Sequence, residues 1–189
     1  MLVLGAAPAS AQVSFHVAVG ARYGTALVHD SIVTPFTVRP AVAPALSITA
    51  LTPLKHGWNA TATLDASITH ISRHDVDGTT TGLGRLSTVM FAVGVRRDIT
   101  AKLSAGVDIG GLKYLPADET GIFKLGAGPL AGVGGLVMGW QIGHGLAVEA
   151  RYDIHSFSTP ALDAEGFASS TLVQRFIVSL TGETGGDER

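Results

Sequence analysis

The stretch Gly145–Phe157, GLAVEARYDIHSF, alternates between apolar and charged side chains more cleanly than any other part of the chain. Every second residue from Leu146 to Ile154 is apolar, and the residues between them include two acids, an arginine and His155. Because successive side chains of a strand point to opposite faces, this pattern predicts a strand with one apolar and one charged face. A soluble sheet would turn the charged face to water, whereas a membrane barrel would turn it into the lumen and the apolar face to lipid.

The same period of two recurs along the chain. It is clear in five further segments: Val13–Tyr23, Asn59–Thr69, Thr88–Arg96, Lys102–Tyr114 and Thr171–Thr181. Two more segments are weaker, since Val38–Leu51 contains two prolines and Phe123–Ile142 is rich in glycine. We expect the pair Gly110-Gly111 to form a bulge that keeps Leu112 and Tyr114 on the apolar face. Eight strands are therefore predicted.

The links between these strands alternate in length. Long links are expected at Gly24–Thr37, Ile71–Arg85, Leu115–Ile122 and Ser158–Ser169, and short ones at Thr52–Gly57, Arg97–Thr100 and Gln141–Gly145. Short turns at one rim and long loops at the other are typical of an up-and-down barrel in a bacterial outer membrane. The sequence thus predicts an all-β fold, an eight-stranded antiparallel transmembrane β-barrel.

Composition and chain ends agree with export to a membrane. The chain has 24 glycines, no cysteine, only 15% charged residues and a formal charge of −2, which excludes thiol chemistry and gives no basis for nucleic-acid binding. Ala9-Ser10-Ala11 resembles a signal-peptidase site. We therefore expect a signal-peptide remnant at 1–11, the barrel at 12–181 and a polar tail at 182–189.

With these residues in view, the chain resembles the small eight-stranded outer-membrane barrels of the OmpA membrane-domain and OmpX type. The resemblance is one of pattern over nearly the whole mature chain. It implies a monomer in the outer membrane, in contact with membrane lipids and lipopolysaccharide, with long extracellular loops able to meet a surface ligand. The final strand, Gln174–Leu180, departs from the family because a polar tail follows it in place of a terminal aromatic residue.

Two groups of side chains follow from this arrangement. A network of charges is expected to fill the narrow lumen: Arg22, Arg39, Asp65, Arg96, Lys102, Asp108, Glu149, Arg151, Asp153, His155 and Arg175, with His16 nearby. Aromatic residues near the strand ends are expected to form girdles at the two membrane interfaces: Tyr23, Trp58, Tyr114, Trp140 and Phe157. The predicted role is structural or surface interaction, without catalysis, metal or cofactor.

Several alternatives remain open at this point. His155 with its neighbouring serines suggests a lipid-modifying enzyme similar to the lipid A deacylases, although Phe157 stands where a serine on the same face would be needed. The charged lumen could also carry ions or small solutes through a narrow path. A soluble lipocalin-like carrier would reverse the two faces. The segment Leu125–Trp140 could form a glycine-rich membrane helix, and the loop Asp75–Gly78 with two histidines could hold a metal.

Overall fold

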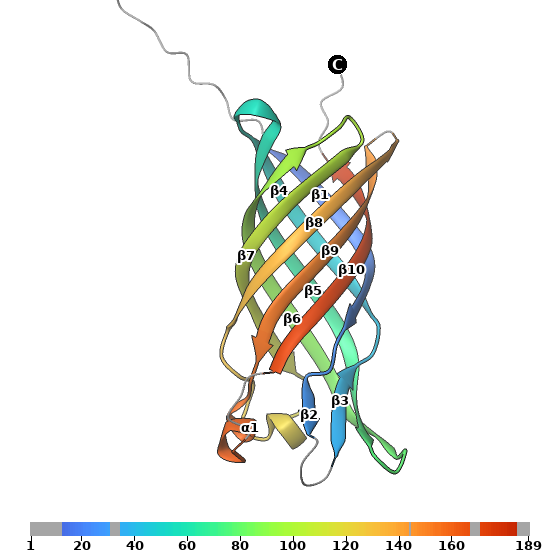
Figure 1. Ribbon diagram of the computed structural model, residues 1–189, viewed down its shortest axis with the longest axis vertical. Coiled ribbons are helices and arrows are strands. Elements are labelled where there is room, and N and C mark those ends of the chain that lie inside the picture. Colours follow the sequence, from blue (N-terminus) through green and yellow to red (C-terminus); the bar gives the residue numbers. More distant parts are fainter. Residues whose placement is uncertain (1–12, 31–34, 144, 167–170, 185–189) are drawn as a thin grey trace, which may run out of the picture.

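The chain folds into a closed antiparallel barrel (Figure 1). The computed structural model describes residues 13–30, 35–143, 145–166 and 171–184. Eight strands form the wall, in the order β1 (Ser14–Gly24), β4 (Ala43–Pro53), β5 (Trp58–Asp75), β6 (Thr80–Asp98), β7 (Leu103–Pro116), β8 (Ala131–Gly143), β9 (Leu146–Phe157) and β10 (Thr171–Thr184). Pairing of β10 with β1 closes the ring, so every strand of the wall has a neighbour on both sides.

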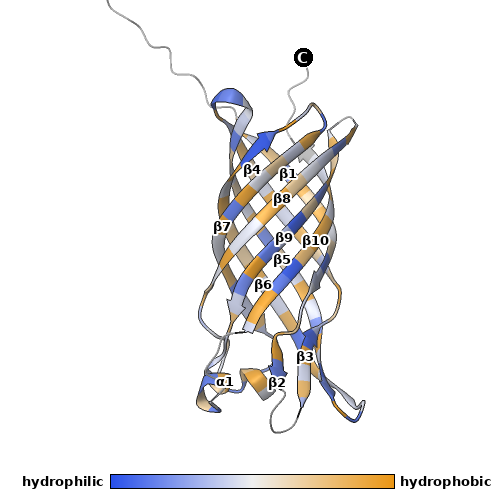
Figure 2. Ribbon diagram, viewed as in Figure 1, coloured by the Kyte–Doolittle hydropathy of each residue, from blue (hydrophilic) through white to orange (hydrophobic). Residues whose placement is uncertain are grey.

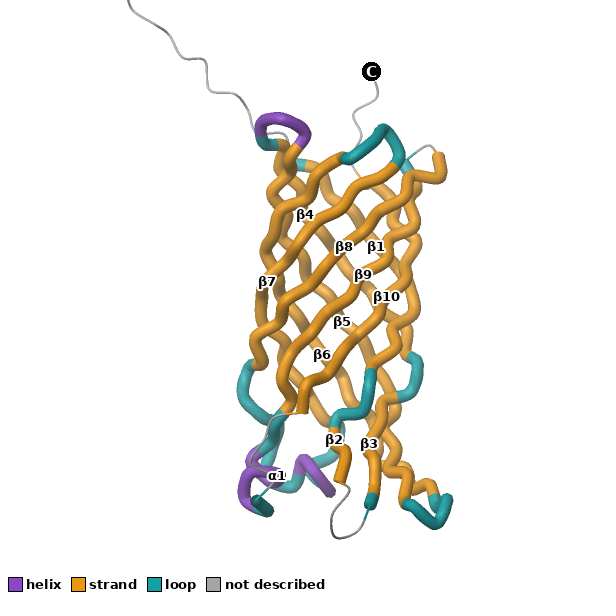
Figure 3. Tube along the Cα trace, in the orientation of Figure 1, coloured by secondary structure: helices purple, strands orange, loops and turns teal. Residues whose placement is uncertain are grey.

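The two ends of the barrel differ, as Figure 3 shows. At one end the strands are joined by short turns, including the 3-10 turn η1 (Lys55–Gly57), and the start of β1 pairs with the end of β10. The other end carries the longer connections, with the small strands β2 (Val28–Asp30) and β3 (Phe36–Pro40), the 3-10 turn η2 (Gly121–Phe123) and the helix α1 (Pro160–Ala164). This confirms the predicted alternation of short turns and long connections for three of the four links at this end, whereas the link between β5 and β6 is a short turn.

The apolar parity of the strands faces outward and forms a belt around the wall. Ile109, Val19 and Phe91 are 69%, 62% and 56% exposed, and apolar and polar residues alternate along the strands (Figure 2). Large apolar side chains exposed on every strand are incompatible with a water-facing surface. The soluble carrier alternative, which needs the apolar face inside, is therefore wrong.

The glycine-rich segment is a strand from Ala131 onward, and its inward positions are Val133, Gly135, Val137 and Gly139. The alternative of a membrane helix at Leu125–Trp140 is wrong. Within the described part of the chain, no helix has the length and apolar character that crossing a membrane requires.

The predicted bulge at Gly110-Gly111 is also wrong, because the pairing of β7 with β6 is continuous. Gly110 lies opposite Ala92 and Gly111 opposite Phe91, without a register shift. A Cβ on Gly110 would lie 2.1 Å from the Phe91 carbonyl oxygen, so this glycine allows the two strands to approach. The parity of β7 therefore runs unchanged to its end.

Some predicted boundaries also differ. Instead of a long link at Ile71–Arg85, β5 and β6 continue as a hairpin with a turn at 76–79, and these strands of 18 and 19 residues exceed the roughly 9–11 that cross a membrane. β10 continues to Thr184, beyond the expected boundary at 181. The expected signal-peptide remnant at 1–11 lies outside the described residues.

Candidate functional site: the lumen and the outer mouth

Strand β9 supplies the largest share of the polar lumen. Its inward positions are Glu149, Arg151, Asp153 and His155, each at most 9% exposed. Alternation places them in one row along the inside of the wall, about 7 Å apart. Partners for this row come from β6, from β7 and from the neighbouring strand β10.

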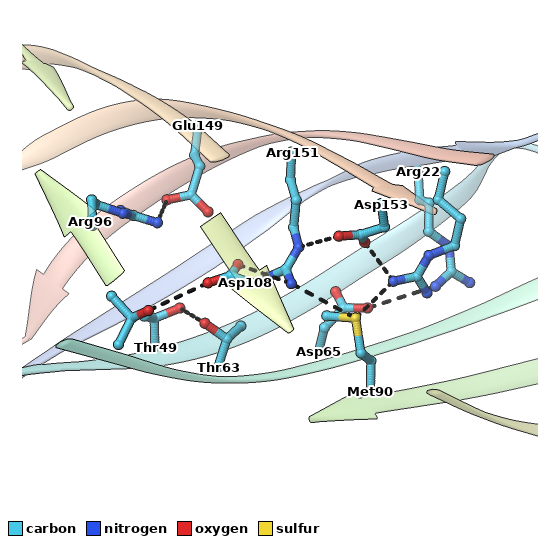
Figure 4. A network of polar contacts seen from close by, with 12 residues as sticks. Arg22, Thr49, Thr63, Asp65, Met90, Arg96, Asp108, Glu149, Arg151 and Asp153 are labelled. Carbon is cyan, nitrogen blue, oxygen red and sulfur yellow. Dashed lines mark hydrogen bonds and ion pairs between the residues drawn. The ribbon is translucent and has the colours of Figure 1, made fainter. Parts of the chain in front are cut away.

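Arg151 and Asp153 form the centre of the network (Figure 4). The Arg151 guanidinium contacts Asp108 through Nη2 at 3.1 Å and Asp153 through Nε at 2.7 Å. The second oxygen of Asp153 accepts a hydrogen bond from Arg175 Nη2 at 2.6 Å. Charge-assisted bonds of this length are the strongest polar contacts in a water-poor interior, so the four side chains form one ionic chain.

A second pair lies beside this chain. Arg22 Nη1 donates to Thr88 Oγ1 at 2.6 Å and lies 3.7 Å from Asp65 Oδ1. Met90, which is fully buried, places its sulfur 2.9 Å from Arg175 Nη2 and fills the space between the arginines. A void of about 20 Å³ remains next to Arg22 and Arg175, enough for about one water.

Toward the short turns the network ends at a pair of its own. Arg96 Nη2 lies 2.8 Å from Glu149 Oε2. Both residues line an open cavity of about 280 Å³ at this mouth, together with Lys102 and Thr181. Counted together, the buried charges described in the structure are four arginines and four carboxylates, so the lumen can be neutral without an ion from outside.

Toward the long connections the lumen is apolar. Tyr114 Oη and His155 Nε2 lie 2.6 Å apart at the border, and from there an aromatic column continues through Phe157 to Phe123, with ring centroids 5.0 and 6.1 Å apart. Phe123 comes from η2. We call the following set of buried residues the apolar plug: Leu27, Val28, Val38, Ile71, Leu86, Met90, Ala92, Leu112, Tyr114, Phe123, Val133, Phe157, Leu162 and Val173.

Outside the plug, the long connections enclose a groove of about 260 Å³. Its base is apolar, with Phe36, Leu83, Ile122 and Leu162, and its rim carries Arg73 and Lys124. Arg73 lies 4.4 Å above the Phe36 ring and 2.7 Å from Asp75 Oδ1, while Lys124 pairs with Glu165. The groove thus combines apolar contact area with charged pairs that are open to solvent.

The same architecture occurs in solved membrane proteins. Ail, the attachment invasion locus protein of Yersinia pestis, solved in complex with the heparin analogue sucrose octasulfate, superimposes with a TM-score of 0.52 at 9% identity, over 91% of this chain and 97% of Ail. AlkL in lipid bilayers gives 0.52 at 10% identity, over 95% and 93% of the two chains. OprG from Pseudomonas aeruginosa gives 0.50 at 9%, over 92% and 95%. No protein-family model matches the sequence, and no curated protein does.

The chain has the fold of an eight-stranded transmembrane β-barrel, the fold that these outer-membrane proteins share. Its exposed apolar belt, its charged lumen and its unequal rims are the features that this kind of barrel needs in a bilayer.

Nine predicted lumen residues of the barrel lie inside the wall, and two do not. Lys102 is exposed in the turn before β7, at the mouth of the short-turn end. Arg39 is exposed on the outside of β3. The physical reason is a register shift: Pro40 lies opposite Ile71 but Ala45 lies opposite Ser67, so one extra residue stands between β3 and β4 and reverses the parity.

Three of the five aromatic residues expected in the girdle face outward, and two do not. Tyr23, Trp58 and Trp140 are exposed on the outer surface, at 50%, 36% and 53%. Tyr114 and Phe157 face inward and are 6% and 2% exposed. The two errors have different causes. Tyr114 was expected outside because of the predicted bulge at Gly110-Gly111, which the continuous pairing of β7 with β6 excludes. Phe157 was expected outside because it lies near a strand end, although the parity of β9 places it on the side of His155.

The apolar plug was missed because its loop residues belong to no strand pattern. Leu27, Phe123 and Leu162 come from three different connections and meet only when the barrel closes. Thr159 helps to fix them, because its hydroxyl donates to the Ile122 carbonyl at 2.6 Å and accepts from Leu162 N. The one available signal was a large apolar residue in each of three long connections.

The geometry around His155 and the Asp75 turn bears on the enzymatic and metal alternatives. Ser156 faces outward, and Ser158 donates to Asp163 at 2.7 Å, so neither serine hydroxyl is hydrogen-bonded to His155.

Beside the Asp75 turn, the two ring nitrogens of His74 are hydrogen-bonded with the hydroxyls of Ser72 and Thr80. Asp77 accepts from Thr79 N at 2.9 Å, and this bond lowers the pKa of its carboxyl. No group of three or more candidate metal ligands occurs among the described residues.

Proposed function

We propose that the barrel is a closed structural protein of the outer membrane whose long-connection end is the interaction face. The observation that carries this proposal is that two different fillings occupy the lumen one above the other. The ionic network lies in the middle, and the apolar plug lies between it and the outer mouth. The loop groove beyond the plug offers the surface for a ligand.

A solute would have to break both fillings to cross. Separating Asp153 from its two arginines leaves buried charges unpaired, which costs several kcal/mol, about 3–5 in measured cases. The plug adds the burial of aromatic and aliphatic side chains, worth about 1.5–3 kcal/mol each. An open, solvent-filled path through this lumen is therefore disfavoured.

The test is conductance in planar lipid bilayers, with the purified, folded protein. We expect no stable open channels under an applied voltage. Large, long-lived conductance steps from the wild-type protein would contradict a closed lumen.

A narrow ion path is the second candidate, because the short-turn cavity of about 280 Å³ leads water to Arg96 and Glu149. From there a proton could move along the ionic chain without an open pore. Proton flux into vesicles, followed with a pH-sensitive dye, separates the two functions. Flux without channel steps would favour the second one.

We also propose that the barrel acts as a monomer and has no hydrolytic activity at His155. A closed ring leaves no strand edge of the wall for pairing with a second copy. His155 is 2% exposed and its Nε2 is engaged with Tyr114. Native mass spectrometry checks the first point. A lipid A deacylation assay comparing wild type with His155→Ala checks the second, and activity lost in the variant would contradict it.

A further inference from the structure

The outer belt ends abruptly on one side of the barrel. Along the outward parity of β5 the last apolar residue is Ile68, and His70 follows it. On β6 the apolar run ends at Val89, and Ser87 and then Arg85 continue that face toward the long connections. The change from apolar to basic residues thus occurs within one or two outward positions, as expected where the hydrocarbon region of a bilayer gives way to the headgroups.

Strand register gathers five basic side chains on this outer face. In one row His29 lies opposite Thr37, Thr37 opposite His74, and His74 opposite Thr80. In the next row Arg39 lies opposite Ser72, and in the third His70 lies opposite Arg85. Paired strands are about 4.8 Å apart and rows about 7 Å apart, so these side chains form a continuous surface. We call this surface the basic strip: His29, Arg39, His70, His74 and Arg85, all of them exposed.

Two of the histidines are held in place on this surface. His29 Nδ1 lies 3.2 Å from Thr37 Oγ1. The His74 ring has Nδ1 at 3.0 Å from Thr80 Oγ1 and Nε2 at 2.9 Å from Ser72 Oγ. Hydroxyl groups between the rings supply further hydrogen-bond donors. The three rows contain no acidic residue. Asp75, which follows His74 in the chain, has the opposite parity and pairs with Arg73 beside the inner groove.

Among the residues that the structure describes, the remaining wall has no such group of basic side chains at the same height. The outward residues nearest the long connections on β8, β9 and β10 are Gly132, Ser156 and Leu172. On β7, Lys113 directs its ammonium to the Gly128 carbonyl oxygen at 2.7 Å. The basic strip therefore lies on one side of the barrel only, over β2, β3, β5 and β6 of the described chain, and faces one direction in the plane of the membrane.

We propose that the basic strip binds the phosphate groups of glycolipid headgroups in the outer leaflet. This proposal rests on the proposed function, because it takes the long-connection end as the external one. Arginine guanidinium groups bind phosphate through two parallel N–H donors, and imidazole and hydroxyl groups add single donors. Because the basic strip adjoins the apolar belt, a ligand with its phosphates at the strip places the rest of its structure against apolar side chains. The acyl chains of a lipid fit this position, and a soluble anion has no such part.

The experiment measures lipid retention by native mass spectrometry in a neutral detergent. The probes are diphosphoryl lipid A, monophosphoryl lipid A and phosphatidylglycerol. The test variant is Arg39→Gln/Arg85→Gln. The matched control is Lys55→Gln/Arg97→Gln, which removes the same charge at the short-turn rim, where Arg97 lies 5.6 Å above the Trp58 ring. Altered gel mobility of unheated samples shows that each variant is folded.

We expect wild type and control to retain diphosphoryl lipid A most strongly, and the test variant to bind it about tenfold more weakly, which corresponds to about 1.4 kcal/mol. Equal retention by test variant and wild type would overturn the assignment of the site. An equal loss in the control, or equal retention of phosphatidylglycerol and lipid A, would overturn the selectivity for glycolipid phosphates. Conductance measured on the same samples keeps this outcome separate from that of the closed lumen.

Discussion

Arg151 and Asp153 each make two ion pairs, more than any other described side chain in the lumen, and Arg151 is the cation of the two. It bridges carboxylates from two strands, Asp108 on β7 and Asp153 on its own strand β9. A bridging cation of this kind cannot be removed without leaving two buried anions with too few partners. The stability of the barrel therefore depends on this arginine more than on any exposed one.

We predict that Arg151→Met destabilises the folded barrel by about 3–5 kcal/mol, because a buried ion pair loses one partner. Urea-dependent folding into lipid vesicles measures this free energy. Arg97→Met at the exposed rim is the control and should cost about 1 kcal/mol or less, the size of an exposed cation–π contact. Equal effects from the two variants would contradict the central role of Arg151.

Asp77 permits a prediction on pH outside the membrane. The Thr79 backbone N–H stabilises the carboxylate and holds its pKa below the ordinary value, so the ionised form favours the folded turn. Its contribution is complete above the unfolded-state pKa and is lost as the pH falls through the lower folded-state value. The protection of the Thr79 amide, which is its exchange rate compared with that of an unstructured peptide at the same pH, should therefore decrease in acid, and Asp77→Asn should remove most of this dependence. Exchange with the same acid dependence in the variant would refute the assignment.

At the scale of the elements, the closeness of β6 and β7 depends on a missing side chain. A Cβ on Gly110 would overlap the Phe91 carbonyl oxygen and the Ala92 Cα. The two strands would have to separate in the middle of the wall, where each pairs along its length. The glycines of this barrel thus differ in importance according to what lies opposite them.

We predict that Gly110→Ala destabilises the barrel by about 1–3 kcal/mol, the usual cost of overpacking. Gly132→Ala is the matched control, since nothing lies within 4 Å of its Cβ position, and it should be nearly neutral. The measurement is the temperature at which the unheated gel band converts to the unfolded one. A control as unstable as Gly110→Ala would show that the opposing backbone is not the cause.

At the scale of the whole molecule, closure has two layers that differ in chemistry. The ionic network is held by strands of the wall, whereas the apolar plug draws on the connections between them. Figure 4 shows the first layer, and the position of α1 in Figure 1 marks the region of the second. Either layer alone is expected to block solutes.

This arrangement predicts a conditional gain of conductance. Phe123→Ala/Phe157→Ala should weaken the plug without opening a channel, and Asp153→Ser/Arg175→Ser should weaken the network without opening one. All four changes together should produce small conductance steps in planar bilayers. Channels from either double variant would contradict closure in two layers.

The sequence by itself determined the fold class. Period-two alternation identified the strands, and the low charge content favoured a membrane barrel over a soluble one. The exposure of the apolar face in the folded barrel decided between these two. Parity also assigned the eight buried charges and His155 to the lumen, since it depends only on neighbouring residues of one strand. The inward or outward face of a residue could be predicted wherever the alternation of apolar and polar residues was unbroken, as it is along β9.

Which side chains meet depends on contacts between strands that are far apart in the sequence. Asp108 and Arg151 come from strands that are separated by β8, and their contact across the lumen depends on strand tilt and on closure of the ring. The side of Arg39 depends on one extra residue between β3 and β4, which only the pairing with β5 shows. Alternation gives the face of each residue but not its height or its partner, because those are set by contacts between segments far apart in the chain.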